Sequence, residues 1–501
     1  MTSGPFADLR NSEAIPTARV PVLPIDAFRR AVIDATSGGW RVSSLFGVPE
    51  SDRSLRLFAI LAHDEHGNLS VGAAKVRESY ESLTPDCPEV HWFEREIAEQ
   101  WGVEPRGHPR LKPIRYQPPR AGERWERPPS AMTDFFRVEG EEVHEVAVGP
   151  VHAGVIEPGH FRFQCFGEEV LHLEIALGYQ HRGVERALVG GPHKRTIHYM
   201  ETLAGDTTVG HAHAYGQAVE AIARIAVPPR GMAIRGIGLE LERIANHIGD
   251  LGAMAGDVGF LPTASYCGRI RGDILNLTAV ICGSRFGRGL IRPGGAAFDL
   301  SDDLLRKLLA GVESGARDLA IADRLFWGSA SVMARIEGVG VVPMDVCEEI
   351  GLVGPAARAC GVDRDVRKDH PFGIYRYTHI PTCTWSAGDV FGRAHIRSIE
   401  IQRSFSFIRE QLEALPIGDV RAECSEPLAP NRIAVSLVEG WRGEICHAAV
   451  TGEDGRFVSY KIVDPSFHNW FGLAYALRGQ QISDFPLCNK SFNLSYCGHD
   501  L

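Results

Sequence analysis

One apolar pattern does most to limit what this chain can fold into. Residues 234–255 read IRGIGLELERIANHIGDLGAMA, and their apolar side chains recur at steps of three and four: Ile237, Leu241, Ile244, Ile248 and Leu251. This spacing places them on one stripe of a helix. Helical patterns also cover 198–226, 265–288 and 303–322. Four such helices in succession predict a bundle with buried polar residues at its centre.

Strand patterns flank the helical region on both sides. Residues 160–166 alternate apolar and polar side chains, a Gly-Glu-Glu turn follows, and apolar residues return over 171–175. This pattern predicts an antiparallel β-hairpin. A further amphipathic helix is predicted over 396–415, and strands over 433–459. The expected fold class is therefore α+β and multidomain, with a hairpin region, a central helix bundle and a mixed C-terminal part.

The N-terminal part predicts a separate small α/β domain over 20–116, preceded by a tail at 1–19. It contains a helical pattern over 26–35 and two strand patterns, 55–62 and 69–76, joined by a His-Gly-Asn turn. Residues 91–102 predict an amphipathic helix, whose charged face is either solvated or a docking surface. Four prolines and clustered charges make 117–142 a linker. The second unit then occupies 143–501.

Composition excludes several kinds of protein. The chain has 501 residues and a net charge of -10, so nucleic acid is not an expected partner. It contains no run of 18 apolar residues and no signal-peptide pattern, which favours a cytoplasmic location. Its eleven cysteines include no CxxC pair, so neither a disulfide framework nor a cluster or other metal held by this chain is expected. It has no GxGxxG loop, so NAD chemistry would occur on another subunit.

Two stretches carry candidate site residues. Residues 199–215 read YMETLAGDTTVGHAHAY, where Gly205 and Gly210 at a helix start indicate a close approach of backbone or ligand; a frayed helix end is the alternative. The loop before the hairpin, GPVHAGVIEPGHFR, brings Glu157 and His160 close in sequence beside glycines and a proline. Such a loop is a candidate for handling protons, although a single loop histidine is usually solvated.

Several motifs, in a fixed order along the chain, resemble those of known families. They are GPVH and EPGHFR, HRGVER, ELERIANH, RPGG, ARACGVDRDVRKDHPFGIY, EGWRGE and the closing SFNLSYCGHDL. Over 146–501 they resemble two related families: large subunits of group 4 membrane-bound [NiFe] hydrogenases, of the formate hydrogenlyase and hydrogenase-4 component G type, and the 49-kDa subunit of complex I. The ordered segments ERE, WGV and GHPRLKPI resemble the 30-kDa subunit of complex I. The chain thus resembles a fusion of the two complex I subunits.

The resemblance also shows where the chain departs from both families. In the hydrogenases, two CxxC pairs bind nickel and iron, and here those positions fall on Ala204 and Thr207 and near Ser495 and Gly498. The complex I tyrosine that contacts quinone falls on Ala204-Gly205. Because alanine and glycine offer no side-chain ligand, we expect no nickel site.

The resemblance implies a cavity beside a [4Fe-4S] cluster held by a partner subunit. We expect four residues to take up protons there as catalytic groups: Asp257, His160, Glu157 and His211. We expect four others to shape the binding of an acceptor such as quinone: Arg182, His181, Gly205 and His499. Each has a simpler alternative role as a loop, cap or surface residue.

The implied function is a subunit of a complex I-like or hydrogenase-related oxidoreductase that couples electron transfer to proton translocation. Implied partners are a small iron–sulfur subunit, a ferredoxin-like subunit and membrane antiporter-like subunits, which would hold the chain on the inner face of the cell membrane. A non-catalytic scaffold or coupling subunit is the alternative, and a true [NiFe] hydrogenase is disfavoured by the missing cysteines.

Overall fold

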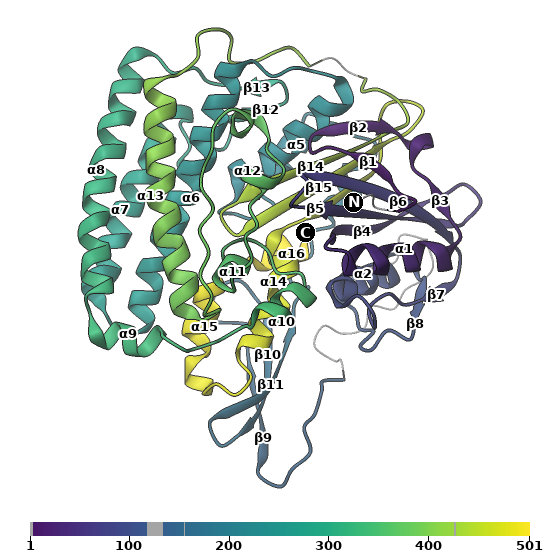
Figure 1. The fold of residues 1–501 in the computed structure, drawn as a ribbon, viewed down its shortest axis with the longest axis horizontal. Coiled ribbons are helices and arrows are strands. Elements are labelled where there is room, and N and C mark those ends of the chain that lie inside the picture. The colour runs from purple at the N-terminus through teal and green to yellow at the C-terminus, as the bar shows by residue number, and fades with distance from the viewer. Residues whose placement is uncertain (1–3, 118–133, 155, 425–426) are drawn as a thin grey trace.

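The computed structural model describes residues 4–117, 134–154, 156–424 and 427–501. Four long helices stand side by side at one edge of the molecule, the N-terminal unit lies at the other, and a β-sheet lies between them (Figure 1). A narrow three-stranded sheet projects away from this body. The fold is mixed α and β with antiparallel sheets, as the sequence predicts.

The N-terminal unit is a five-stranded sheet covered by helices. Its strand order is β1-β6-β5-β4, with β3 paired in parallel to β6. The elements are β1 (Ala7–Leu9), β3 (Val22–Leu23), α1 (Ile25–Ser37), β4 (Arg41–Pro49), β5 (Leu55–His63), β6 (Asn68–Val76), β7 (Ser79–Glu81), α2 (His91–Trp101) and β8 (Glu104–Arg106). The predicted helices and hairpin of this unit are confirmed.

The expected tail at residues 1–19 is wrong where the structure describes it. Strand β1 pairs with β6, and β2 (Glu13–Pro16) pairs with a strand of the C-terminal sheet. Buried Leu9 and Ile15 anchor these strands, and pairing satisfies their backbone polar groups. The segment therefore joins the two units. Most of the expected linker, residues 118–133, lies outside the described residues.

The hairpin is confirmed and gains a third strand. Strands β10 (His160–Phe166) and β11 (Glu169–Ala176) pair antiparallel, and β9 (Val143–Val148) pairs along the other side of β10. Phe161, Phe163 and Cys165 share the buried face of β10, as alternation predicts.

The helix bundle differs from the prediction in one member. It contains α6 (Pro229–Asp257), α7 (Leu261–Cys282), α8 (Asp302–Trp327) and α13 (Val390–Glu413) (Figure 1). The pattern at 198–226 instead divides into α4 (Thr196–Met200) and α5 (Thr208–Ala223), because the chain turns at residues 201–207. Helix α5 is buried almost all round and packs mainly on the C-terminal sheet.

The predicted polar centre of the bundle is present. Glu240 of α6 accepts hydrogen bonds from Tyr375 (2.7 Å), Arg367 and Arg243 (both 3.1 Å). All four side chains are buried, so each charge needs these partners.

The C-terminal part completes the body around the sheet β16-β15-β14-β2. Its strands are β14 (Arg432–Gly440), β15 (Gly443–Thr451) and β16 (Phe457–Val463), followed by α14 (Pro465–Ala476), α15 (Phe485–Phe492) and α16 (Tyr496–Asp500). The remaining elements are short: η1 (Thr17–Arg19), η2 (Pro88–Val90), α3 (Val184–Leu188), β12 (Ile291–Arg292), β13 (Gly295–Ala296), α9 (Ala330–Ile336), α10 (Met344–Glu349), α11 (Gly354–Ala359), α12 (Val366–Asp369), η3 (Gly373–Arg376) and η4 (Ile482–Asp484).

Among the described helices, none combines the length and the apolar character that crossing a bilayer requires.

Candidate functional site

The turn between α4 and α5 faces the C-terminal segment. Arg182 holds the two together, because its guanidinium donates to the carbonyl oxygens of Thr202 (2.7 Å), Leu203 (2.8 Å) and Cys497 (3.5 Å). Its backbone N–H also donates to the carbonyl of Leu501 at 2.9 Å. The two segments that carry the expected ligand positions are therefore adjacent in the fold.

Cys497 lies at the centre of this junction. Its sulfur lies 3.5 Å from the Ser495 hydroxyl, and the Glu157 carboxylate and the Gly205 backbone lie close enough to affect the pKa of the thiol. Burial, followed by the negative charge of Glu157, raises the pKa of the thiol to about 12. Glu157 also accepts a hydrogen bond from Gln180 at 3.0 Å. The structure thus brings Glu157, Arg182 and Gly205 together at the tail.

The donor set at this junction does not fit a nickel–iron centre. Such a centre requires several thiolates, because soft sulfur ligands suit these metals. Ala204, Thr207, Ser495 and Gly498 stand where the resemblance places cysteines, and Cys497 is a protonated thiol at neutral pH. Thr207 accepts a hydrogen bond from Trp441, and Ser495 caps α16. The absence of nickel from this chain stays a prediction, which elemental analysis can test.

A chain of four buried side chains starts beside the tail. His211 Nε2 lies 2.9 Å from Asp464 Oδ2, His211 Nδ1 lies 3.1 Å from His447 Nε2, and His447 Nδ1 lies 3.0 Å from the Tyr460 hydroxyl. None of the four side chains is exposed by more than 1 %. Asp464 packs against Gly498, where an added Cβ would lie 2.7 Å from its carboxyl carbon.

These contacts allow one consistent set of protons. With both imidazoles neutral, Tyr460 donates to His447, His447 donates to His211, and His211 donates to Asp464. Burial holds the pKa of His447 well below its usual value, which keeps it neutral. A shift of each proton by one bond would leave a tyrosinate at Tyr460, and burial raises the pKa of that hydroxyl well above its usual value. The four side chains therefore form a fixed buried hydrogen-bonded chain that holds Asp464 beside the tail.

A buried carboxyl also lies at the start of α5. Glu242 of α6 accepts hydrogen bonds from the backbone N–H groups of Val209 (2.7 Å) and Gly210 (3.1 Å). Burial raises the pKa of Glu242 to about 8, although these hydrogen bonds lower it; the nearby Asp206 raises it further. Glu242 therefore changes its protonation near neutral pH, beside the turn at residues 201–207.

A polar cavity of about 390 Å³ adjoins the same turn. Its lining includes Asp206, Asn246, Asp250, Arg271 and Lys490. Arg442 donates to both carboxylate oxygens of Asp206, at 2.6 and 2.7 Å, and so fixes one wall. The cavity can hold a polar group several atoms in size.

Three of the predicted residues lie apart from this junction. Asp257 is exposed at the end of α6, where burial of its carboxyl raises its pKa and Lys490 lowers it. His160 begins β10; its Nδ1 lies 3.3 Å from the Gly149 carbonyl, and burial lowers its pKa. His499 faces the N-terminal unit and lies between the rings of Trp92 and Phe467.

The other predicted residues have defined positions. His181 Nδ1 lies 2.6 Å from the Asp500 carbonyl, and burial lowers its pKa. His211 lies inside the buried hydrogen-bonded chain between Asp464 and His447. Sequence reasoning missed Glu242, Asp464 and His447; Glu242 lies on α6 outside the apolar stripe, where an acidic side chain is usually solvated. For Asp464 and His447 no local pattern exists, because their partners are distant in sequence.

A second cavity, of about 520 Å³, is apolar and separate. It lies between α2, the sheet of β10 and β11, and α14, and its lining includes Trp92, Phe136, Leu173, Trp470 and Phe471. The eight residues predicted for the site do not line it.

Comparisons with known proteins agree with the arrangement of two fused units. Residues 257–435 match the family described as "Respiratory-chain NADH dehydrogenase, 49 Kd subunit", and residues 29–129 match "Respiratory-chain NADH dehydrogenase, 30 Kd subunit". Formate hydrogenlyase subunit 5 of Escherichia coli is 28 % identical over 488 residues, which cover 92 % of this chain and 84 % of that protein.

Two other relatives match a shorter part of this chain. The carbon monoxide-induced hydrogenase of Rhodospirillum rubrum is 30 % identical over 353 residues, covering 70 % of this chain and 97 % of that protein. NADH-quinone oxidoreductase subunit 4 of Thermus thermophilus is 32 % identical over 371 residues, covering 68 % of this chain and 90 % of that protein.

Proposed function

Because the chain belongs to the family that unites the 49-kDa subunit of NADH-quinone oxidoreductase with large subunits of membrane-bound hydrogenases, and carries a 30-kDa-type domain at its N-terminal end, we propose that it works as a redox subunit of a complex I-like assembly. In this proposal it exchanges electrons with a [4Fe-4S] cluster on a partner subunit and couples that exchange to proton translocation. It holds no redox metal of its own.

The observation that carries the proposal is the junction of the 201–207 turn with the tail. It joins an arginine clamp, a polar cavity and the buried carboxyl of Glu242 within one part of the fold. An electron that arrives nearby adds negative charge and so raises the pKa of a neighbouring group, which favours uptake of a proton. Each unit by which the pKa rises corresponds to about 1.4 kcal/mol of coupling between electron and proton. Glu242, with a pKa of about 8, is suited to that uptake.

A quinone or another small polar acceptor fits the proposal as the oxidant. The polar cavity beside Asp206 supplies carboxylate, amide and cationic groups for its head. Arg182, at the exposed side of the junction, would face the partner's cluster. The proposed partners are a small iron–sulfur subunit, a ferredoxin-like subunit and membrane antiporter-like subunits, with attachment to the inner face of the membrane through them.

The test is purification of the intact assembly with the chain as bait, followed by elemental analysis and reconstitution. We expect iron and acid-labile sulfide in whole-number ratios to the chain, nickel below 0.1 per chain as an order-of-magnitude threshold, and acidification or alkalinisation of vesicles on reduction. Stoichiometric nickel, or purification of the chain without an iron–sulfur partner, would refute the proposal.

The alternative proposal is a scaffold subunit that transmits conformational change without chemistry. The burial of Met200, Phe492 and Tyr496 favours it, since these side chains fill space near the junction. The open cavity beside Asp206 favours the redox role instead. The Glu242→Gln substitution separates the two proposals. It should change how the electron-transfer activity of the assembly depends on pH if the chain has the redox role, and leave that dependence unchanged if the chain is a scaffold.

A further inference from the structure

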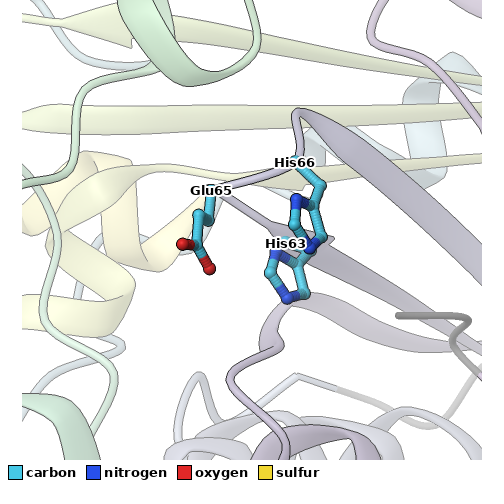
Figure 2. Close-up of side chains that lie close together, drawn as sticks. All are labelled: His63, Glu65 and His66. Carbon is cyan, nitrogen blue, oxygen red and sulfur yellow. The ribbon is translucent and has the colours of Figure 1, made fainter.

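The turn between β5 and β6 gathers three metal-ligating side chains. His63, Glu65 and His66 each offer one ligand atom, and these three atoms lie within 4.8 Å of one another (Figure 2). Among the described residues, these three form the cluster of histidine, cysteine or acidic side chains that could hold a metal ion. The three belong to one tight hairpin, where the Gly67 N–H donates to the Asp64 carbonyl at 3.3 Å. Their spacing is thus fixed by the turn and does not depend on distant packing.

His63 supplies an independent observation. Only 5 % of its surface is exposed, and its buried Nδ1 has no hydrogen-bond partner. A buried imidazole nitrogen without a partner carries a free-energy cost that a ligand can remove. The ring of His66 stacks against it, with ring centres 4.4 Å apart, and both Glu65 and His66 are exposed.

We propose that His63, Glu65 and His66 bind a divalent late transition-metal ion, for which Zn²⁺ is the test ion. Two imidazoles and one carboxylate are ligands that Zn²⁺ prefers, whereas Ca²⁺ and Mg²⁺ prefer oxygen alone. Zinc–ligand bonds are about 2.0–2.2 Å long, so donors must lie within about 4 Å of one another. Rotation of the exposed His66 and Glu65 side chains closes the remaining distance, and water completes the coordination.

The position of the site suggests what the ion does. Asp64, between two of the ligands, binds Arg41 (2.8 Å), Arg364 (2.6 Å) and His370 (3.1 Å), and so ties the N-terminal unit to the C-terminal unit. An ion on the flanking side chains would fix the turn that presents Asp64.

The test uses the full chain, purified without a histidine tag and titrated with ZnCl₂ by calorimetry. We expect one ion per chain and a rise in melting temperature on Zn²⁺ addition. His66→Ala should weaken binding at least by the roughly tenfold to hundredfold factor that loss of an outer-sphere partner causes. His144→Ala, which removes another exposed histidine next to a glutamate, should bind as the unaltered chain does.

X-ray absorption spectroscopy identifies the zinc ligands directly, so this test does not depend on how stable each variant is. X-ray absorption of the zinc-loaded chain should show two imidazole ligands, and one in His66→Ala. Equal affinity in His66→Ala and the unaltered chain, equal losses in both variants, or a spectrum without imidazole scattering would each overturn the proposal.

Discussion

Replacing Glu242 by glutamine should change how the stability of the chain depends on pH. Glu242 is a buried carboxyl that accepts two backbone N–H groups at the start of α5. Its pKa rises from the ordinary 4.5 to about 8, chiefly because burial penalises the charged form. Glutamine keeps the shape and one acceptor oxygen but never ionises, so it isolates the effect of the charge.

The sign and size follow from proton linkage. Between pH 4.5 and pH 8 the unfolded chain releases this proton while the folded chain keeps it, so the stability of the folded chain falls as pH rises. The slope is about 1.4 kcal/mol per pH unit, or about 5 kcal/mol over the whole interval. Below pH 4.5 the carboxyl is protonated in both states and its contribution is constant. The Glu242→Gln variant lacks this slope.

The variant should therefore be slightly less stable than the unaltered chain at pH 5, by about 1 kcal/mol for the lost hydrogen bond. At pH 8 it should be more stable, by about 3 kcal/mol. For cooperative unfolding of 501 residues, 1 kcal/mol corresponds to about 1 °C in Tm.

Melting curves from pH 5 to pH 8.5 measure this difference, with the exposed Glu313→Gln of α8 as the matched control. Parallel curves for Glu242→Gln and the unaltered chain would show that Glu242 is ionised throughout and would refute the reasoning. Glu313→Gln should run parallel to the unaltered chain.

Three further outcomes are expected. Asp464→Asn removes the anionic partner of His211 and should lower stability by about 1.5–3 kcal/mol in melting curves, whereas the exposed Asp454→Asn should change it by less than about 0.5 kcal/mol. Arg41→Met leaves buried carboxylates without their cation and should cost about 3–5 kcal/mol in denaturant unfolding. Arg182→Gln should slow reoxidation of the partner's cluster in the purified assembly, followed by electron paramagnetic resonance, while Tm changes by less than about 2 °C, because Arg182 is exposed.

The sequence predicts the fold where periodicity is clear. The stripe from Ile237 to Leu251 predicts α6, and the alternation of Phe161, Phe163 and Cys165 predicts β10, because one buried face imposes each period. The pattern over residues 198–226 misleads because burial on one face alone is missing there. Helix α5 is buried on nearly all sides, so its apolar pattern does not reveal that it packs on a sheet. Tail residues 7–16 mislead because pairing with distant strands has no local pattern.

The candidate site is predicted less completely than the fold. Glu157, Arg182 and Gly205 lie near one another at the tail, and their roles stay predictions. Asp257 lies at the exposed end of α6, and Asp250, two turns earlier, is the acid of this helix that lines the cavity. Both acids belong to α6, and their spacing in the sequence does not show which of them faces the cavity. That depends on how α15 packs against α6.

The seam between the two units gives a reason for their fusion in one chain. Arg41 of the N-terminal unit binds Glu444 of β15, and buried Glu96 of α2 binds Lys461 of β16 at 2.6 Å. Glu96 also binds Arg115, which donates to the His499 carbonyl at 2.8 Å in the tail. Charges buried in this way are costly when their partners are absent. The N-terminal unit therefore supports the tail that forms one wall of the candidate site, and separating the units would expose unpaired charges on both.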